Sequence, residues 1–113
     1  MLLADGRVLV VDGAAQVAEL YDPTTGTWTL TSSLPTARRY PAATLLADGT
    51  VLIVGGASRF AREYPYGPVN ALATAERHEP ASGTWTPAGR MAADRRGHTA
   101  TLLRDGTVLV AGG

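Results

Sequence analysis

The sequence predicts an all-β chain in which one short antiparallel unit is repeated about two and a half times. A twelve-residue apolar block occurs three times, at residues 2–13, 45–56 and 102–113. A second block, residues 19–29, recurs as residues 76–86. Both blocks consist of short runs rich in β-branched residues and bounded by Gly, Pro and Asp, which is typical of strands and tight turns. Their fixed succession indicates a repeat architecture.

The repeat also predicts how the chain is divided. Residues 1–43 form a first unit whose opening strand is truncated, and residues 44–100 form a complete second unit. Residues 101–113 supply the first two strands of a third unit. The second unit is longer than the first because it carries an insertion at about residues 57–70. Nothing in the repeated scaffold requires this insertion, which makes it a candidate functional loop.

Each unit is expected to contain four strands joined by tight turns. They are clearest, from first to fourth, at residues 42–46, 51–54, 19–21 and 27–29. An Asp-Gly pair separates the first strand from the second in all three copies. This pair favours a two-residue type I′ turn, because glycine tolerates the positive φ angle that the turn needs. Residues 22–26, Asp-Pro-Thr-Thr-Gly, are a turn sequence between the third and fourth strands, so the unit is an antiparallel meander.

The second strand of the unit is apolar on both of its faces, since residues 51–54 read Val-Leu-Ile-Val. Side chains alternate between the two faces of a sheet, so a strand of this kind has to be covered on both sides. Similar four-stranded sheets that stack face to face meet this requirement. This is the arrangement of blades in a β-propeller.

The repeated residues also resemble the kelch repeat. The resemblance rests on the diglycine after the second strand, on Tyr21 in the sequence Tyr-Asp-Pro, and on Trp28 at the end of Thr-Gly-Thr-Trp. It covers the whole chain. Three positions depart from the pattern: Asp12 replaces a glycine, His78 replaces the tyrosine, and Pro41 stands where the third unit has His98.

This resemblance implies a segment of a kelch-type β-propeller, with about two and a half four-stranded antiparallel blades. Kelch propellers resemble rings of about four to eight blades, so this chain is not expected to close a ring alone. A free blade face exposes more apolar surface than monomers usually show. We therefore expect further blades of a parent chain, or self-association, to complete the ring. Structural roles are expected for Gly13, Gly55, Gly56, Gly112, Gly113, Tyr21, Trp28, Trp85, Arg39 and Arg96.

One end of the predicted blades collects arginine and aromatic side chains. Alternate connections of a meander lie at the same end, so the insertion shares one end with the links at residues 36–40 and 93–98. Arginine with tyrosine suits recognition of carboxylate or sulfate and stacking on sugar rings. Arg39 and Arg96 recur at one blade position, which favours a scaffold role in pinning the link between blades. The ligand-binding candidates are Arg59, Phe60, Arg62, Tyr64, Tyr66, Arg38 and Arg95.

The composition excludes several classes of function. Ten basic and ten acidic residues give the 113-residue chain no formal net charge, so no overall field attracts nucleic acid or an anionic membrane. The absence of cysteine excludes disulfides and thiolate metal sites within the chain. No apolar run approaches the ~20 residues of a membrane span, and the first residues lack the pattern of a secretory signal. The compartment is left open, with an extracellular or periplasmic location slightly favoured.

The sharpest enzymatic alternative is a copper radical enzyme similar to galactose oxidase, whose family carries a kelch propeller. That resemblance implies two tyrosines and two histidines around copper, with one tyrosine crosslinked to cysteine, and this chain has no cysteine. His78 and His98 fall far apart in the predicted blade, which argues against shared metal ligation. Ser58 lacks the second glycine of a nucleophile elbow.

We therefore expect a non-catalytic scaffold that binds a protein or a glycan, with no cofactor and no metal. One alternative is the propeller portion of a galactose-oxidase-like or other secreted enzyme whose catalytic residues lie outside this segment. The other is a purely structural surface array with no discrete ligand.

Overall fold

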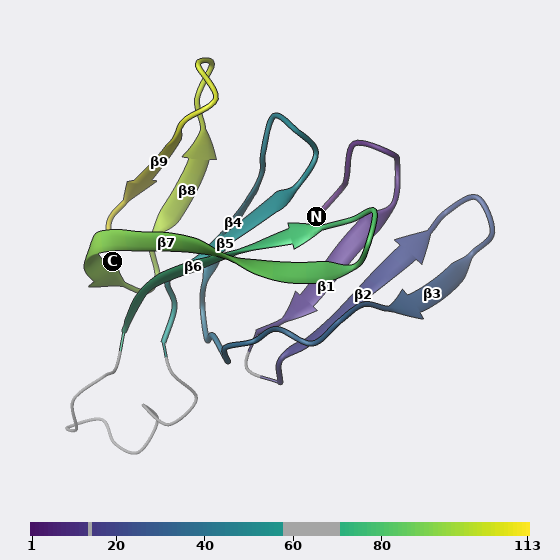
Figure 1. Ribbon diagram of the computed structural model, residues 1–113, viewed down its shortest axis with the longest axis horizontal. Coiled ribbons are helices and arrows are strands. Elements are labelled where there is room, and N and C mark those ends of the chain that lie inside the picture. Colours follow the sequence, from purple (N-terminus) through teal and green to yellow (C-terminus); the bar gives the residue numbers. More distant parts are fainter. Residues whose placement is uncertain (14, 58–70) are drawn as a thin grey trace.

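The computed structural model of the chain describes residues 1–13, 15–57 and 71–113, and these residues form three antiparallel sheets and no helix (Figure 1). The all-β prediction is confirmed. The first sheet contains β1 (Val8–Asp12), β2 (Val17–Asp22) and β3 (Thr27–Leu30). The second contains β4 (Ala42–Leu45), β5 (Val51–Val54), β6 (Leu72–Glu79) and β7 (Thr84–Arg95). The third contains β8 (Thr99–Leu102) and β9 (Val108–Ala111).

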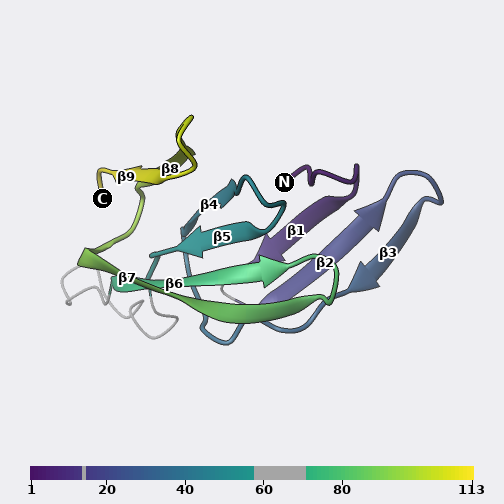
Figure 2. The same ribbon diagram turned by 45° about the horizontal axis from the view of Figure 1, so that its top comes forward.

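The three sheets follow one another as layers, and the second sheet lies between the other two (Figure 2). Val51 and Ile53 of β5 pack in one buried cluster with Leu9 and Leu20 of the first sheet. Val54 belongs to a second cluster, against which Ala100 and Val110 of the third sheet pack. Strand β5 is therefore covered on both faces, as its apolar sequence predicted.

The turn between the first two strands of a unit is one residue longer than predicted. The amide of Leu46 donates to the carbonyl of Thr50 (2.8 Å), and the amide of Gly49 donates to the carbonyl of Leu46 (3.0 Å). A type I′ turn needs positive φ at two residues, but here only Gly49 has one, at +88°. The type I′ prediction is therefore wrong. Asp48 keeps an ordinary φ, and its Oδ1 accepts bonds from the amide and the hydroxyl of Thr50 (3.0 and 2.6 Å).

The two tryptophans of the repeat lie in different environments. Trp85 is buried between the first and second sheets, and its Nε1 donates to the carbonyl of Ser32 (2.9 Å). Trp28 is 56% exposed. Its ring lies 4.8 Å from the ring of Tyr21, centroid to centroid, and the two rings are tilted relative to each other. Trp28, for which a structural role was expected, is exposed because no described segment packs on its face of the first sheet.

The links between sheets run along the end of the molecule opposite the hairpin turns (Figure 1). The segment that leads from β3 to β4 forms a bridge with Ala57, through reciprocal backbone bonds of 2.8 Å between Arg39 and Ala57. Ala57 also bridges Ala71. The insertion therefore leaves and rejoins the scaffold beside Arg39, at the end where the sequence placed the candidate residues.

Candidate functional site

Arg38 lies buried within the link and ties it to the second sheet. Its side chain is 1% exposed. Nε donates to Glu76 Oε1 (2.9 Å), and Nη1 donates to the carbonyls of Gly55 (2.9 Å) and Thr74 (2.7 Å). Nη2 donates to Thr74 Oγ1 (2.9 Å). Because Glu76 is itself buried, the pair compensates both charges within the protein.

Arg95 repeats part of this arrangement one unit later. Its Nη1 donates to the carbonyl of Gly112 (2.7 Å), which is the repeat equivalent of Gly55. Arg38 and Arg95 thus supply side-chain contacts that hold the links, and the scaffold role expected for Arg39 and Arg96 stays a prediction. Consecutive side chains of an extended link point to opposite sides, so only one of Arg38 and Arg39 can face the second sheet. Arg38 does so because Glu76 and Thr74, which are distant in the sequence, accept its hydrogen bonds. Arg38, predicted as a ligand-binding residue, has no exposed donor to offer a ligand.

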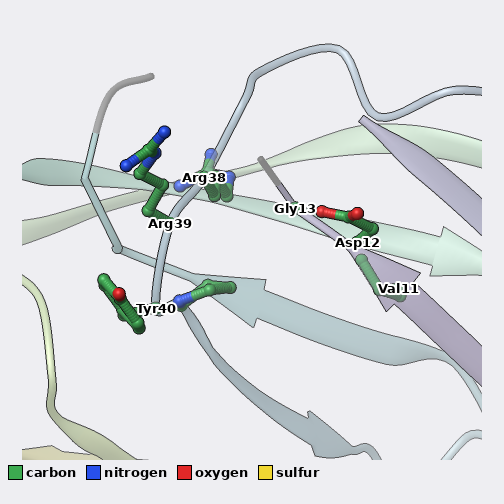
Figure 3. Close-up of a pocket in the computed structure, with 7 residues that line it drawn as sticks. Val11, Asp12, Gly13, Arg38, Arg39 and Tyr40 are labelled. Atoms are coloured by element: carbon green, nitrogen blue, oxygen red, sulfur yellow. The ribbon is translucent and has the colours of Figure 1, made fainter. Parts of the chain in front are cut away.

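Arg39 is one of the residues that line a pocket of about 410 Å³ at the same end of the molecule (Figure 3). Arg39 and Tyr40 lie on one side of it, and Val11 and Asp12 lie on the other. The Nε of Arg39 is buried and has no hydrogen-bond partner within the part of the chain that the structure describes. A buried donor without a partner is costly, and the half-buried side chain that carries this nitrogen lines the pocket. The pocket is lined by Val11, Asp12, Gly13, Arg38, Arg39, Tyr40 and Pro41.

Asp12 and Tyr40 add two different binding groups to this pocket. Asp12 is exposed, and its Oδ1 accepts a bond from the amide of Ala15 (3.1 Å). Tyr40 is 71% exposed and has a φ of +54°, a conformation that is unusual for an aromatic residue. The repeat equivalent of Tyr40 is Gly97, which has a φ of +65°. The scaffold therefore imposes a left-handed conformation here, and Tyr40 keeps its ring at the pocket in spite of the strain.

The pocket opens where the repeats differ from one another. At the junction of the second and third sheets, His98 is buried and its Nε2 lies 2.9 Å from the carbonyl oxygen of Val54. The ring fits there because Gly55 has no side chain: a Cβ at Gly55 would lie 2.6 Å from His98 Cε1. At the junction of the first and second sheets, Asp12 replaces that glycine and Pro41 replaces that histidine. At that junction both replacements line the pocket.

Sequence reasoning missed this pocket, although the signal was present. Asp12 and Pro41 were recognised as departures from the repeat. Tyr40, which stands next to Pro41 where the third unit has Gly97, is a further departure. These departures lie apart in the sequence, but the structure brings them to one pocket. The candidates in the insertion, Arg59, Phe60, Arg62, Tyr64 and Tyr66, lie outside the described residues.

The two histidines occupy separate places. His78 is fully buried, with its ring 4.8 Å from that of Trp85, and neither of its nitrogens has a hydrogen-bond partner among the described residues. Burial lowers the pKa of His78, and the positive charge of Arg7 lowers it further. His98 lies at the other sheet junction. The described residues contain no group of three or more His, Cys, Asp or Glu side chains placed to hold a metal, and no helix long and apolar enough to cross a membrane.

Comparison with known proteins supports the fold. No family model and no curated protein sequence matches the chain. Among solved structures, the chain is similar to the one described as "Structure of YjhT", with a TM-score of 0.79 and 18% sequence identity. The match covers 98% of this chain and 32% of that one, so this chain spans about a third of its length. At this identity the likeness shows a shared fold alone.

Proposed function

We propose that this chain is part of a kelch-type β-propeller that acts as a non-catalytic binding scaffold, and that the pocket beside Arg39 holds the ligand. The repeat of strands and turns, the stacking of three similar sheets and the recurrence of the Arg38 contact at Arg95 support the propeller assignment. The sheet-to-sheet packing serves as a rigid frame, and the residues that break the repeat serve recognition.

One observation carries this proposal. The junction of the first and second sheets has a pocket lined by Asp12 and Pro41, which stand where the next junction has Gly55 and His98. The replacements are chemically suited to binding. Arg39 offers donors to a carboxylate, a carbonyl or a hydroxyl, and Asp12 offers an acceptor to a hydroxyl or an amide. Tyr40 offers an aromatic face. This combination fits a polar ring with several hydroxyl groups, as in a glycan, and also fits a polar loop of a protein.

The lining favours binding over bond cleavage. The described lining residues include a single carboxylate and no serine, threonine, histidine or cysteine. Among the described lining residues, Asp12 has no second acidic or basic catalytic side chain beside it. General acid–base catalysis and nucleophilic catalysis typically use a pair of such side chains.

The proposal is tested by measuring glycan and peptide binding in arrays with the chain and its variants. We expect binding by the wild type, and a loss of at least about tenfold in affinity for Arg39→Ala, as for removal of a hydrogen bond to a charged group. Tyr40→Gly should also weaken binding, and without harm to the fold, since glycine accepts the φ angle at this position. Arg96→Ala is the matched control, because it removes the equivalent arginine at the other junction.

Two outcomes would contradict the proposal. One is equal binding by the wild type, Arg39→Ala and Tyr40→Gly. The other is a complete absence of glycan and peptide binding. A combined variant of Arg59, Arg62, Tyr64 and Tyr66 to Ala separates the insertion from the pocket: a loss confined to that variant assigns recognition to the insertion instead.

A further inference from the structure

His78 lies in the junction between the first and second sheets, and its ring has no hydrogen bond there. Its side chain is 0% exposed. In the register of the second sheet it is paired with Val51 and with Trp85, and both belong to the apolar cluster that joins the two sheets. Neither Nδ1 nor Nε2 has a hydrogen-bond partner among the described residues. A neutral imidazole loses its hydrogen bonds to water in such a place, and a charged imidazole loses far more.

The repeat does not require a histidine at this position. Tyr21 is the equivalent of His78 in the first unit, and its ring lies 4.8 Å from Trp28, as the ring of His78 lies 4.8 Å from Trp85. The scaffold therefore accepts an aromatic ring that carries no charge between pH 5 and pH 8. Histidine is the side chain whose ordinary pKa lies in that range.

Two charged side chains act on His78. Arg7 comes from the first sheet, directly before β1, and its Nη2 lies 3.5 Å from the carbonyl oxygen of Pro80. Glu79 is the next residue after His78 along β6. Burial lowers the pKa of His78, Arg7 lowers it further, and Glu79 raises it to a smaller extent.

The other charged groups around His78 have partners of their own. Glu76 lies on the same face of β6 and is paired with Arg38. In the neighbouring turns and strands, Asp5 is bonded to Arg7, Asp22 to the amide of Thr24, Asp48 to Thr50, and Arg77 to Glu79. Within the described chain, no carboxylate is thus placed to accept a proton-bearing nitrogen of His78.

Protonation of His78 is therefore unfavourable while the junction is packed. It places a charge in an apolar cluster, near a second cation and without an acceptor. When the two sheets separate, water solvates the ring and its ordinary pKa returns. The open form binds the proton more readily, so acid shifts the equilibrium toward it. The packed form is fully favoured above the ordinary pKa of histidine, about 6.5, and becomes less favoured as the pH falls below that value.

We infer that His78 is an acid-sensitive switch that opens the junction between the first and second sheets while each sheet keeps its strands. Near His78 the sheets are joined by side-chain packing and by a few hydrogen bonds, such as those from Trp85 Nε1 to the carbonyl of Ser32 and from the amide of Ser32 to the carbonyl of Gly83. Within each sheet the strands are bonded along their length. The junction is thus the weaker contact, and it opens first.

The switch also acts on the pocket. Val11 and Asp12 of β1 line it from the first sheet, and Arg39 lines it from the link that is tied to Ala57 of the second unit. Separation of the two sheets moves these residues apart, so acid should weaken binding. This consequence rests on the proposed function, whereas the opening of the junction does not.

The test uses Trp85 as a reporter of the junction. Trp28→Phe leaves Trp85 as the only tryptophan of the chain, and its accessibility to acrylamide is measured as a Stern–Volmer constant from about pH 8 to about pH 5. Trp85 should be protected at the upper pH, and the open fraction should rise by up to about tenfold for each pH unit below the ordinary pKa of histidine. Far-UV circular dichroism should stay constant over the same range.

Three further variants in this background assign the effect. His78→Phe keeps an aromatic ring beside Trp85 and should leave it protected at every pH. Arg7→Gln removes the nearby cation and should make the acid rise smaller. His98→Asn is the matched control: it removes the chain's other histidine, whose Nε2 lies 2.9 Å from the carbonyl oxygen of Val54, and the acid rise should persist.

Three results would overturn the inference. Trp85 could stay protected over the whole pH range, the acid rise could persist in His78→Phe, or the strand signal could be lost together with the protection of Trp85, which means that the whole chain unfolds. Ligand affinity is a separate readout and should fall several-fold in acid for the wild type and not for His78→Phe. Equal affinity at both pH values overturns the action on the pocket. A lack of any ligand contradicts the proposed function, and Trp85 still decides the switch.

Discussion

Arg38 and Arg39 are neighbours in the chain whose guanidinium groups lie in opposite environments. Arg38 is surrounded by acceptors from the second sheet and is paired with a buried carboxylate. Arg39 has a buried nitrogen without a partner beside an open pocket. At the scale of single residues, one arginine ties the link to the second sheet and its neighbour lines the pocket.

Replacing Arg38 should destabilise the fold strongly. Arg38→Ala leaves Glu76 buried without its cation, and breaking a buried pair in this way costs about 3–5 kcal/mol. Arg95→Ala removes an exposed contact to Gly112 and should change stability by about 0.5 kcal/mol or less. Urea unfolding followed by tryptophan fluorescence measures both values. Equal losses in the two variants would contradict the role that we assign to Arg38.

His78 should make stability depend on pH in the acid range. Its pKa in the folded state is lowered, first by burial and then by Arg7, so the unfolded chain binds the proton more readily. Stability is therefore full above the ordinary pKa of histidine and falls as the pH decreases below it. His78→Phe should remove this dependence and raise stability by about 1–3 kcal/mol at neutral pH, since it removes buried nitrogens without partners. Thermal unfolding at several pH values checks this, and an unchanged acid slope in His78→Phe would assign the effect to other groups.

At the scale of elements, each of two hairpin turns depends on one glycine with a positive φ angle. Gly49 and Gly106 both have a φ of +88°, and each follows an aspartate whose Oδ1 accepts bonds from the threonine two residues later. These bonds lower the pKa of Asp48 and of Asp105, with the threonine hydroxyl as the largest cause. The turn is thus held by local contacts that recur with the repeat.

Gly49→Ala should destabilise the second sheet through the backbone alone. No heavy atom lies within 4 Å of a Cβ at this position, so the substitution creates strain and no clash. A left-handed conformation costs an alanine roughly 1–2 kcal/mol. Ala47→Gly, in the same exposed turn, is the control and should have a much smaller effect. Denaturant unfolding measures both, and equal effects would mean that the φ angle of Gly49 is not the cause.

At the scale of the whole molecule, one kind of sheet-to-sheet contact is used twice. The second sheet packs against the first on one face and against the third on the other. The pocket lies at the end of the stack where the links between sheets run. The pocket and the apolar packing between sheets therefore involve different residues.

Much of the fold could be predicted because its determinants are local. The continuous apolar run Val-Leu-Ile-Val places β5, the Asp-Gly pair places the turn before it, and Asp-Pro-Thr-Thr-Gly places the turn between β2 and β3. The length of the hairpin loop was missed, because Asp-Gly fits both a two-residue and a three-residue loop. The exposure of Trp28 was also missed, because the repeat pattern does not say which segment packs against a given residue.

The strands, their antiparallel order and the end of the sheets at which the links lie follow from the sequence alone, because periodicity and turn chemistry act within about ten residues of chain. The tertiary structure decided which arginine is buried, since Glu76 is 38 residues from Arg38 and selects it over Arg39. The structure also decided where the pocket lies, because Asp12 and Pro41 act together only once two sheets have packed. Contacts of that range leave no local pattern in the sequence.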